Sequence, residues 1–140
     1  MTLIVLTTFG SSGDLNPYVA LGLGLRSRGH DVVFAVEEAF RAMVEEAGFP
    51  VRHLSGEAMS VLGTHVDGLV GRSTPLRSLR VLIEQYLLPT LRPRIDDLLA
   101  ACEGADLLVA ATTQVAASFV AELKQLPLVT VTLTPITVPS

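Results

Sequence analysis

The sequence is poor in the residue types that build disulfides and metal sites. It holds one cysteine, Cys102, which excludes an internal disulfide, and three histidines scattered along 140 residues. No group of histidine, cysteine and acidic residues has metal-ligand spacing, so neither a bound metal nor another cofactor is expected. Cys102 follows an apolar run and is expected to be a small core side chain rather than a reactive thiol.

Long apolar runs are also absent, and so is an excess of positive charge. No stretch approaches the roughly 18 uninterrupted apolar residues of a membrane-spanning helix, and a strand begins at Leu3, too early for a signal peptide. A cytoplasmic location is therefore expected. The net charge of −4 argues against nucleic-acid binding by the whole domain.

Basic charge is nonetheless concentrated in one segment, where Glu84 is the one counter-charge among five arginines: Arg72, Arg77, Arg80, Arg92 and Arg94. The simplest interpretation is that these arginines form the solvent-exposed face of helical structure. The alternative is that they hold an acidic or lipid-like ligand, which would allow peripheral contact with a membrane.

The length and composition fit one compact domain over 1–140. Hydrophobic residues make up 49% of the chain and charged residues 17%, and the mean hydropathy is +0.51. This balance is high for a soluble domain, so part of the apolar surface is expected to meet a partner.

Apolar runs alternate with helical patterns along the chain. Strands are predicted at 3–6, 31–36, 50–54, 106–111 and 127–134, and helices at 17–28, 39–47, 76–87, 93–104 and 115–124. Pro89 should kink or stop the third helix, and 55–74 is predicted to be a long loop that lines a binding site. The alternation predicts an α/β fold: a Rossmann-like, doubly wound parallel sheet in three layers.

The loop after the first strand carries the main functional signal. It contains Gly10-Ser11-Ser12-Gly13-Asp14, followed by Asn16 as the expected N-cap and Pro17 in the first turn of a helix. A helix N-terminus after such a turn presents free N–H groups and suits a phosphate, although Asp14 would repel one and better faces a hydroxyl. The alternative is a plain βα turn in which Asp14 caps the helix.

Two further features bear on the ligand. The loop lacks the middle glycine of the dinucleotide fingerprint G-x-G-x-x-G, and Glu37 lies further on than an acid that binds ribose would. Both disfavour a nucleotide-binding oxidoreductase or epimerase. Thr112, Thr113 and Gln114 follow the fourth strand, where doubly wound sheets bind ligands, although Thr113 could instead cap the next helix.

Several segments together resemble the N-terminal half of nucleotide-sugar glycosyltransferases of the two-domain GT-B type, including those that act on sterols, antibiotic aglycones and rhamnolipids. They are the loop from Gly10 to Pro17, and the segments Arg28–Val32, Glu46–Phe49 and Leu126–Val129. The resemblance covers essentially all 140 residues. It implies that the chain is an acceptor-binding domain and that a C-terminal donor-binding domain is absent from it.

The resemblance also implies roles for individual residues. Asp14 would be the catalytic base that takes a proton from a hydroxyl of a small, lipophilic acceptor, with inversion at the sugar. Ser11, Ser12 and Gly13 would border the donor diphosphate, and Thr112, Thr113 and Gln114 would face the acceptor. No D-x-D motif is present, in agreement with metal-independent chemistry. A non-catalytic partner-binding domain stays open as an alternative.

Overall fold

The fold is an α/β sandwich built on one parallel sheet. The computed structural model describes residues 2–9, 12–56, 76–77, 80 and 83–133. Its five strands are β1 (Leu3–Thr7), β2 (Asp31–Val36), β3 (Val51–His53), β4 (Leu107–Ala111) and β5 (Leu128–Val131). They lie in the order β3-β2-β1-β4-β5, and all neighbouring pairs are parallel. The prediction of a doubly wound parallel sheet is confirmed.

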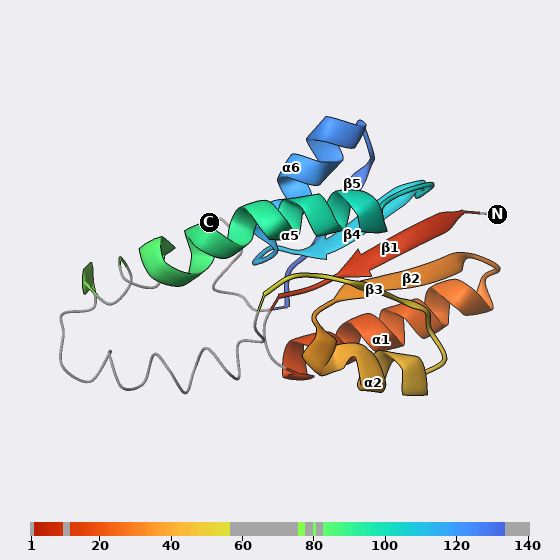
Figure 1. Cartoon of the computed structure of the whole chain (residues 1–140). Helices are drawn as coiled ribbons and strands as arrows, with labels where there is room; N and C mark the ends of the chain where they lie inside the picture. The colour runs from red at the N-terminus through yellow and green to blue at the C-terminus, as the bar shows by residue number, and fades with distance from the viewer. Residues whose placement is uncertain (1, 10–11, 57–75, 78–79, 81–82, 134–140) are drawn as a thin grey trace.

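Helices cover both faces of this sheet (Figure 1). On one face lie α1 (Ser12–Ser27) and α2 (Glu38–Glu46), and on the other lie α5 (Leu88–Ala101) and α6 (Val115–Lys124). A short π-helix, η1 (Ile83–Leu87), runs directly into α5. Alternate side chains of each strand therefore point into one of two cores, as expected of a sheet buried on both sides.

Each core is filled by side chains from the strands and from two helices. The α1/α2 side buries Ile4, Leu6, Leu15, Tyr18, Val32, Phe34, Val36, Val44, Phe49, Val109 and Ala111. The α5/α6 side buries Val5, Ala35, Leu54, Leu98, Ala101, Cys102, Leu108, Ala110, Ala116, Ala117, Val120 and Ala121. Cys102 is a core residue as predicted, and burial raises the pKa of its thiol to about 11.

The start of α1 differs from the prediction. We expected the helix to begin at Pro17 with Asn16 as its N-cap, but α1 begins at Ser12 and Pro17 lies inside it. Pro17 removes one N–H bond, the one that would reach the carbonyl of Gly13. Asp14 in the first turn favours the earlier start, because a carboxylate there interacts well with the positive end of the helix dipole.

The helical segment around Pro89 also begins earlier than predicted. The second helical piece starts at Leu88 rather than near Pro93, and Pro89 is its second residue, directly after η1. Pro89 thus marks the junction between η1 and α5 rather than the end of a helix.

Close packing explains one of the two glycines inside α1. A Cβ added at Gly22 would lie 3.1 Å from the ring of Phe34 on β2, so a side chain there would press α1 away from the sheet. Gly24 meets no such contact with the sheet, so the expected close approach holds at Gly22 alone.

Apolar surface is exposed on α6, as the composition led us to expect. Val115, Phe119 and Leu123 follow one another at four-residue intervals and are 43%, 47% and 67% exposed. This spacing places them on one side of the helix, away from the core.

Candidate active site at the carboxyl edge of the sheet

The carboxyl ends of β1 and β4 meet at the centre of the sheet. The strand order reverses direction between these two neighbours, which makes their shared end a topological switch point. Doubly wound sheets bind their ligands in the crevice that forms there. The segments that follow the two strands, Thr8–Phe9 and Thr112–Gln114, therefore define the candidate site, together with the N-terminus of α1.

Gln114 ties these two segments together. Its side chain is buried, and its amide nitrogen donates to Thr7 Oγ1 at 3.0 Å and to the carbonyl oxygen of Thr8 at 3.2 Å. The hydroxyl of Thr113 donates to the carbonyl oxygen of Phe9 at 3.0 Å. The end of β4 thus holds the backbone that leaves β1.

The three polar residues after β4 differ in what they can offer to a ligand. Thr112 and Thr113 are exposed, and Thr112 lies 3.2 Å from the hydroxyl of Thr132 beyond β5. Gln114 is the N-cap residue of α6 and makes no side-chain capping bond, so the alternative in which Thr113 caps this helix is wrong. Contact of Thr112, Thr113 and Gln114 with an acceptor stays a prediction.

Asp14 lies in the first turn of α1, the helix that follows β1 in the chain, and is half-buried. Tyr18 follows it by one helical turn, so the two side chains share a face of α1. Tyr18 is buried, and its burial, with the nearby charge of Asp14, raises the pKa of the phenol to about 12. Gly13 is exposed and Ser12 is the first residue of α1, whereas Ser11 lies outside the described residues.

A buried ion pair joins the end of β2 to α5. Arg94 Nη2 lies 2.6 Å from Glu37 Oε1, and the two side chains are 6% and 3% exposed. Burial raises the pKa of Glu37, and the hydrogen bond and charge of Arg94 oppose that rise. Glu37 is therefore engaged by Arg94 inside the protein.

The interpretation of Arg94 as a solvent-exposed arginine is wrong. Arg94 lies one turn before Leu98 and two before Ala101, all on the side of α5 that packs against the sheet. Its place in the apolar repeat Leu91, Ile95, Leu98 was the signal that could have identified it. Arg92 and Arg80, in contrast, are exposed as predicted.

Arg94 also contacts the segments that follow β1 and β3. Its guanidinium lies over the ring of Phe9, 5.0 Å from the centroid. Gly56 follows β3, and a Cβ added there would lie 2.3 Å from Arg94 Nη2, so a side chain at this position would require the guanidinium of Arg94 to shift. One arginine thus contacts residues beyond three adjacent strands.

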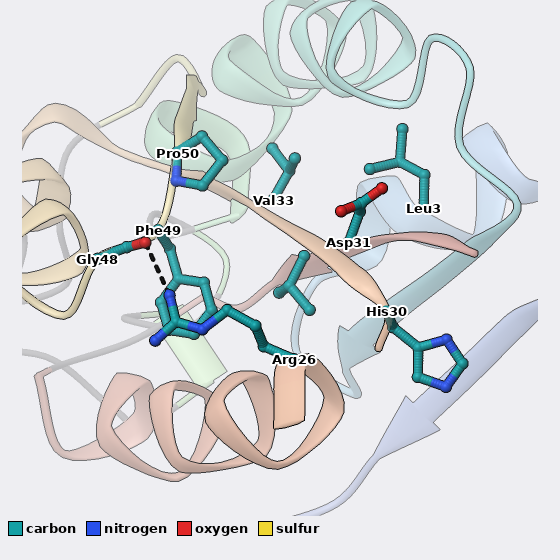
Figure 2. A pocket seen from close by; sticks show the side chains of 9 residues that line it. Leu3, Arg26, His30, Asp31, Val33, Gly48, Phe49 and Pro50 are labelled. Atoms are coloured by element: carbon teal, nitrogen blue, oxygen red, sulfur yellow. Dashed lines mark hydrogen bonds between the residues drawn. The ribbon is translucent and has the colours of Figure 1, made fainter. Parts of the chain in front are cut away.

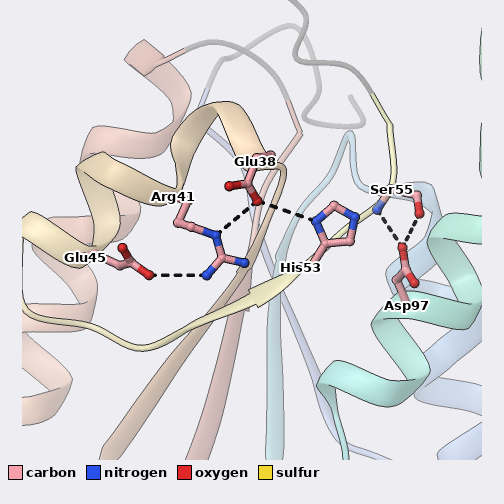
Figure 3. A network of polar contacts seen from close by, with 6 residues as sticks. All are labelled: Glu38, Arg41, Glu45, His53, Ser55 and Asp97. Carbon is pink, nitrogen blue, oxygen red and sulfur yellow. Dashed lines mark hydrogen bonds and ion pairs between the residues drawn. The ribbon is translucent and has the colours of Figure 1, made fainter.

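Asp97, one turn further along α5, also connects this helix to the segment after β3 (Figure 3). Its carboxylate accepts hydrogen bonds from the backbone N–H of Ser55, at 2.7 Å, and from the hydroxyl of the same residue. A chain of surface ion pairs, Glu45 to Arg41 to Glu38 with His53 3.9 Å from Glu38, lies on the far side of β3. His53 is an exposed strand residue, as predicted.

Three buried polar atoms in the described part of the chain have no hydrogen-bond partner: Thr8 Oγ1, the hydroxyl of Tyr18 and Arg94 Nη1. Each belongs to a residue at or next to the candidate site. Within the same described ranges, no group of three or more histidine, cysteine or acidic residues could hold a metal ion. Among these residues, too, there is no helix with the length and apolar character needed to cross a membrane.

A cavity of about 360 Å³ lies at the opposite edge of the sheet (Figure 2). It is lined by Arg26, His30 and Asp31, and by mainly apolar residues that begin β1 and β2 or precede β3. Arg26 donates to the carbonyl oxygen of Gly48 at 2.9 Å and stacks over the ring of Phe49. The amino ends of the strands border this cavity, so it is separate from the candidate site.

The sheet order and the candidate site place this chain in the class of doubly wound α/β domains, which bind their ligands at the carboxyl edge of the sheet. The glycosyltransferase family 28 N-terminal domain matches residues 4–140. The chain belongs to this family and is a glycosyltransferase N-terminal domain.

Two curated relatives agree with this assignment. The chain is 31% identical over 129 residues to a sterol 3-beta-glucosyltransferase of Yarrowia lipolytica, which covers 89% of this chain and 8% of that protein. It is 54% identical over 54 residues to the O-mycaminosyltylonolide 6-deoxyallosyltransferase of Streptomyces fradiae, covering 39% of this chain and 13% of that protein. The chain therefore spans a small part of each relative's length.

Solved glycosyltransferases share the fold. SnogD from Streptomyces nogalater superposes with a TM-score of 0.68 at 24% identity, over 96% of this chain and 34% of that chain. The spinosyn rhamnosyltransferase SpnG, complexed with thymidine diphosphate, superposes with a TM-score of 0.70 at 17% identity, over 99% and 37%. The neighbours are GT-B enzymes, and the Rossmann-like fold predicted from the sequence is confirmed.

Proposed function

We propose that this chain is the acceptor-binding half of an inverting, metal-independent glycosyltransferase that moves a sugar from a nucleotide-sugar donor to a hydroxyl of a small, lipophilic acceptor. Its family membership gives the class of enzyme. The acceptor class is supported by two relatives, one named for a sterol and the other for O-mycaminosyltylonolide. A separate C-terminal domain would supply the main donor site. A lipid-like acceptor would bring the enzyme into peripheral contact with a membrane.

The placement of Asp14 carries the proposal. It lies in the first turn of the helix that follows the central strand, at the edge where this fold binds ligands. In the proposed reaction its carboxylate takes the proton of the acceptor hydroxyl while that oxygen attacks the anomeric carbon. The bond from the anomeric carbon to the diphosphate breaks, and the nucleotide diphosphate leaves with the electron pair.

The N-terminus of α1 supports a diphosphate beside this carboxylate. The first N–H groups of a helix have no partner within it, and they lie at the positive end of the dipole. In α1 the first two of these groups belong to Ser12 and Gly13. They would stabilise the negative charge that develops on the leaving diphosphate, with Ser11 next to them in sequence, and no metal is required in this scheme.

The test is Asp14→Asn in the two-domain enzyme that carries this chain. We expect turnover to fall at least about 100-fold while the KM for the nucleotide sugar stays within about twofold, because the amide keeps the shape but cannot accept the proton. Asp31→Asn, at the opposite edge of the sheet, is the matched control and should leave turnover unchanged. Unchanged turnover in Asp14→Asn would rule out Asp14 as the base and favour a capping role.

The isolated chain provides a second test. We expect it to have no transferase activity and no micromolar affinity for nucleotide sugars, because the proposed donor site lies on the C-terminal domain. Calorimetric titration with UDP-glucose and TDP-glucose measures this affinity, and micromolar binding would contradict the proposed division of labour. Tight binding of NAD(P) in the same experiment would instead support the oxidoreductase alternative.

A further inference from the structure

Arg94 carries a hydrogen-bond donor that the described protein does not use. Its Nη2 pairs with Glu37 and its guanidinium faces Phe9, but Nη1 is buried and has no partner. The side chain is 6% exposed. A buried donor without an acceptor loses its bonds to water and gains none in return.

The stability of the folded protein does not account for a buried arginine whose Nη1 has no partner. Replacing a buried ion pair with apolar residues of similar size is often neutral or stabilising. A protein selected for stability alone would therefore have little reason to keep an arginine with a spare N–H group at this position. The arginine is better explained by a ligand that accepts a hydrogen bond from Nη1.

The location of Arg94 supports a ligand. The residues around it lie beyond the carboxyl ends of neighbouring strands: Phe9 after β1, Glu37 after β2 and Gly56 after β3. The carboxyl edge is where doubly wound sheets bind their ligands. The aromatic ring and the guanidinium lie next to each other at that edge.

The charge and polarity of these neighbours limit what the ligand can be. Glu37 compensates the charge of Arg94, so the pair has little attraction for an anion such as phosphate. Phe9 favours an apolar body, and Nη1 requires an oxygen acceptor. These preferences describe an uncharged molecule that carries a hydroxyl or carbonyl oxygen on an apolar skeleton.

We propose that Arg94 is a specificity-determining residue of the acceptor site: its Nη1 donates a hydrogen bond to a neutral oxygen of the acceptor, whose apolar body packs against Phe9. This inference rests on the proposed function, because it takes the ligand at this edge to be the acceptor of the glycosyl transfer. It adds a polar contact from α5 to the site formed by α1 and β4.

The experiment uses the two-domain enzyme with ergosterol and UDP-glucose, and with O-mycaminosyltylonolide and a TDP-6-deoxyhexose. Arg94→Lys keeps a cation for Glu37 but lacks the second planar N–H group. We expect the acceptor KM to rise at least about tenfold, with kcat and the donor KM within about twofold, because a hydrogen bond to a charged donor is lost from acceptor binding alone. Arg92→Lys, an exposed arginine on the same helix, should change none of these constants.

The double variant Glu37→Leu/Arg94→Met guards against a failure to fold. It removes both charges together, and it should fold and show the same rise in acceptor KM. An unchanged acceptor KM in Arg94→Lys would overturn the inference, and so would equal changes in kcat and in both KM values. If the unaltered enzyme turns over neither pair of substrates, the proposed function fails first, and the role of Arg94 in acceptor binding fails with it.

Discussion

Breaking the buried ion pair between Glu37 and Arg94 from one side should strongly destabilise the domain. The substitution Arg94→Met keeps most of the volume of the side chain but removes its charge. Glu37 then remains 3% exposed at the end of β2, without the guanidinium that lies 2.6 Å from it. The cost is therefore that of a buried carboxylate with no compensating charge.

Removing one partner of a buried pair costs about 3–5 kcal/mol at neutral pH, because the other charge stays desolvated. Such a loss is a large part of the roughly 5–15 kcal/mol that stabilises a typical domain. The double variant Glu37→Leu/Arg94→Met removes both charges, and we expect its free energy of unfolding to lie within about 1 kcal/mol of the original protein or above it.

The pH dependence of the free energy of unfolding gives an independent check of the effect of Arg94→Met. Burial raises the pKa of Glu37 in the native state above its ordinary value of 4.5, so the native state holds this proton to higher pH than the unfolded chain does. The stability that Glu37 contributes is therefore fully present below pH 4.5 and is lost as the pH rises through the native pKa. Arg94→Met removes the two influences that lower this pKa. The difference from the original protein should thus widen from pH 4.5 to pH 7.

Urea unfolding followed by circular dichroism at 222 nm measures these quantities at each pH. With a slope of about 1–3 kcal/mol/M, the expected loss moves the midpoint by more than about 1 M. The reasoning would be refuted by a single variant within about 1 kcal/mol of the original protein at pH 7, or by a double variant as unstable as the single one. If Arg94→Met does not fold at all, the unfolding curve of the double variant still decides the question.

Two further predictions concern the polar residues around β1. Gln114→Leu leaves the carbonyl oxygen of Thr8 and the hydroxyl of Thr7 without their shared donor. We expect a loss of about 1–3 kcal/mol by the same urea assay, whereas Gln85→Leu on the exposed part of η1 should be neutral. The absorbance at 295 nm of the variant Tyr86→Phe reports the ionisation of Tyr18. Its midpoint should lie near pH 12 in the native state, against about pH 10 in the unfolded chain. Since the native state keeps this proton longer, stability should fall between those two values; a native midpoint near pH 10 would contradict the burial of the phenol.

The strands and their order of alternation were predictable because each is a short apolar run bounded by turn residues, the pattern of a sheet covered on both faces. The start of α1 was misjudged because Asn16 and Pro17 are typical of a helix entry, while the favourable interaction of Asp14 with the dipole began the helix at Ser12.

The site was only partly predictable, because its geometry depends on contacts between residues far apart in the sequence. The sequence predicted that polar residues follow β1 and β4, since strand ends can be located from the apolar runs. It gave no sign that Gln114 turns back to Thr7, or that Arg94 reaches Glu37 across 57 positions. A charged residue in a helix is usually solvated, and for Arg94 the apolar repeat around it was the one sequence signal against that expectation.

Gln114 and Arg94 both contact the short segment Thr8–Phe9, and this bears on how Asp14 could act. Gln114 and Thr113 hold the backbone of Thr8 and Phe9 from the β4 side. Arg94 covers the ring of Phe9 from the α5 side. Thr8 and Phe9 are thus fixed from two directions by side chains outside the helix that carries Asp14. Asp14, the base proposed above, would have to hold its position through the reaction, and contacts that fix the preceding backbone would serve that requirement. It follows that Gln114, which holds the backbone itself, should affect the rate, whereas Arg94 should affect the acceptor affinity, and neither touches the proton that moves.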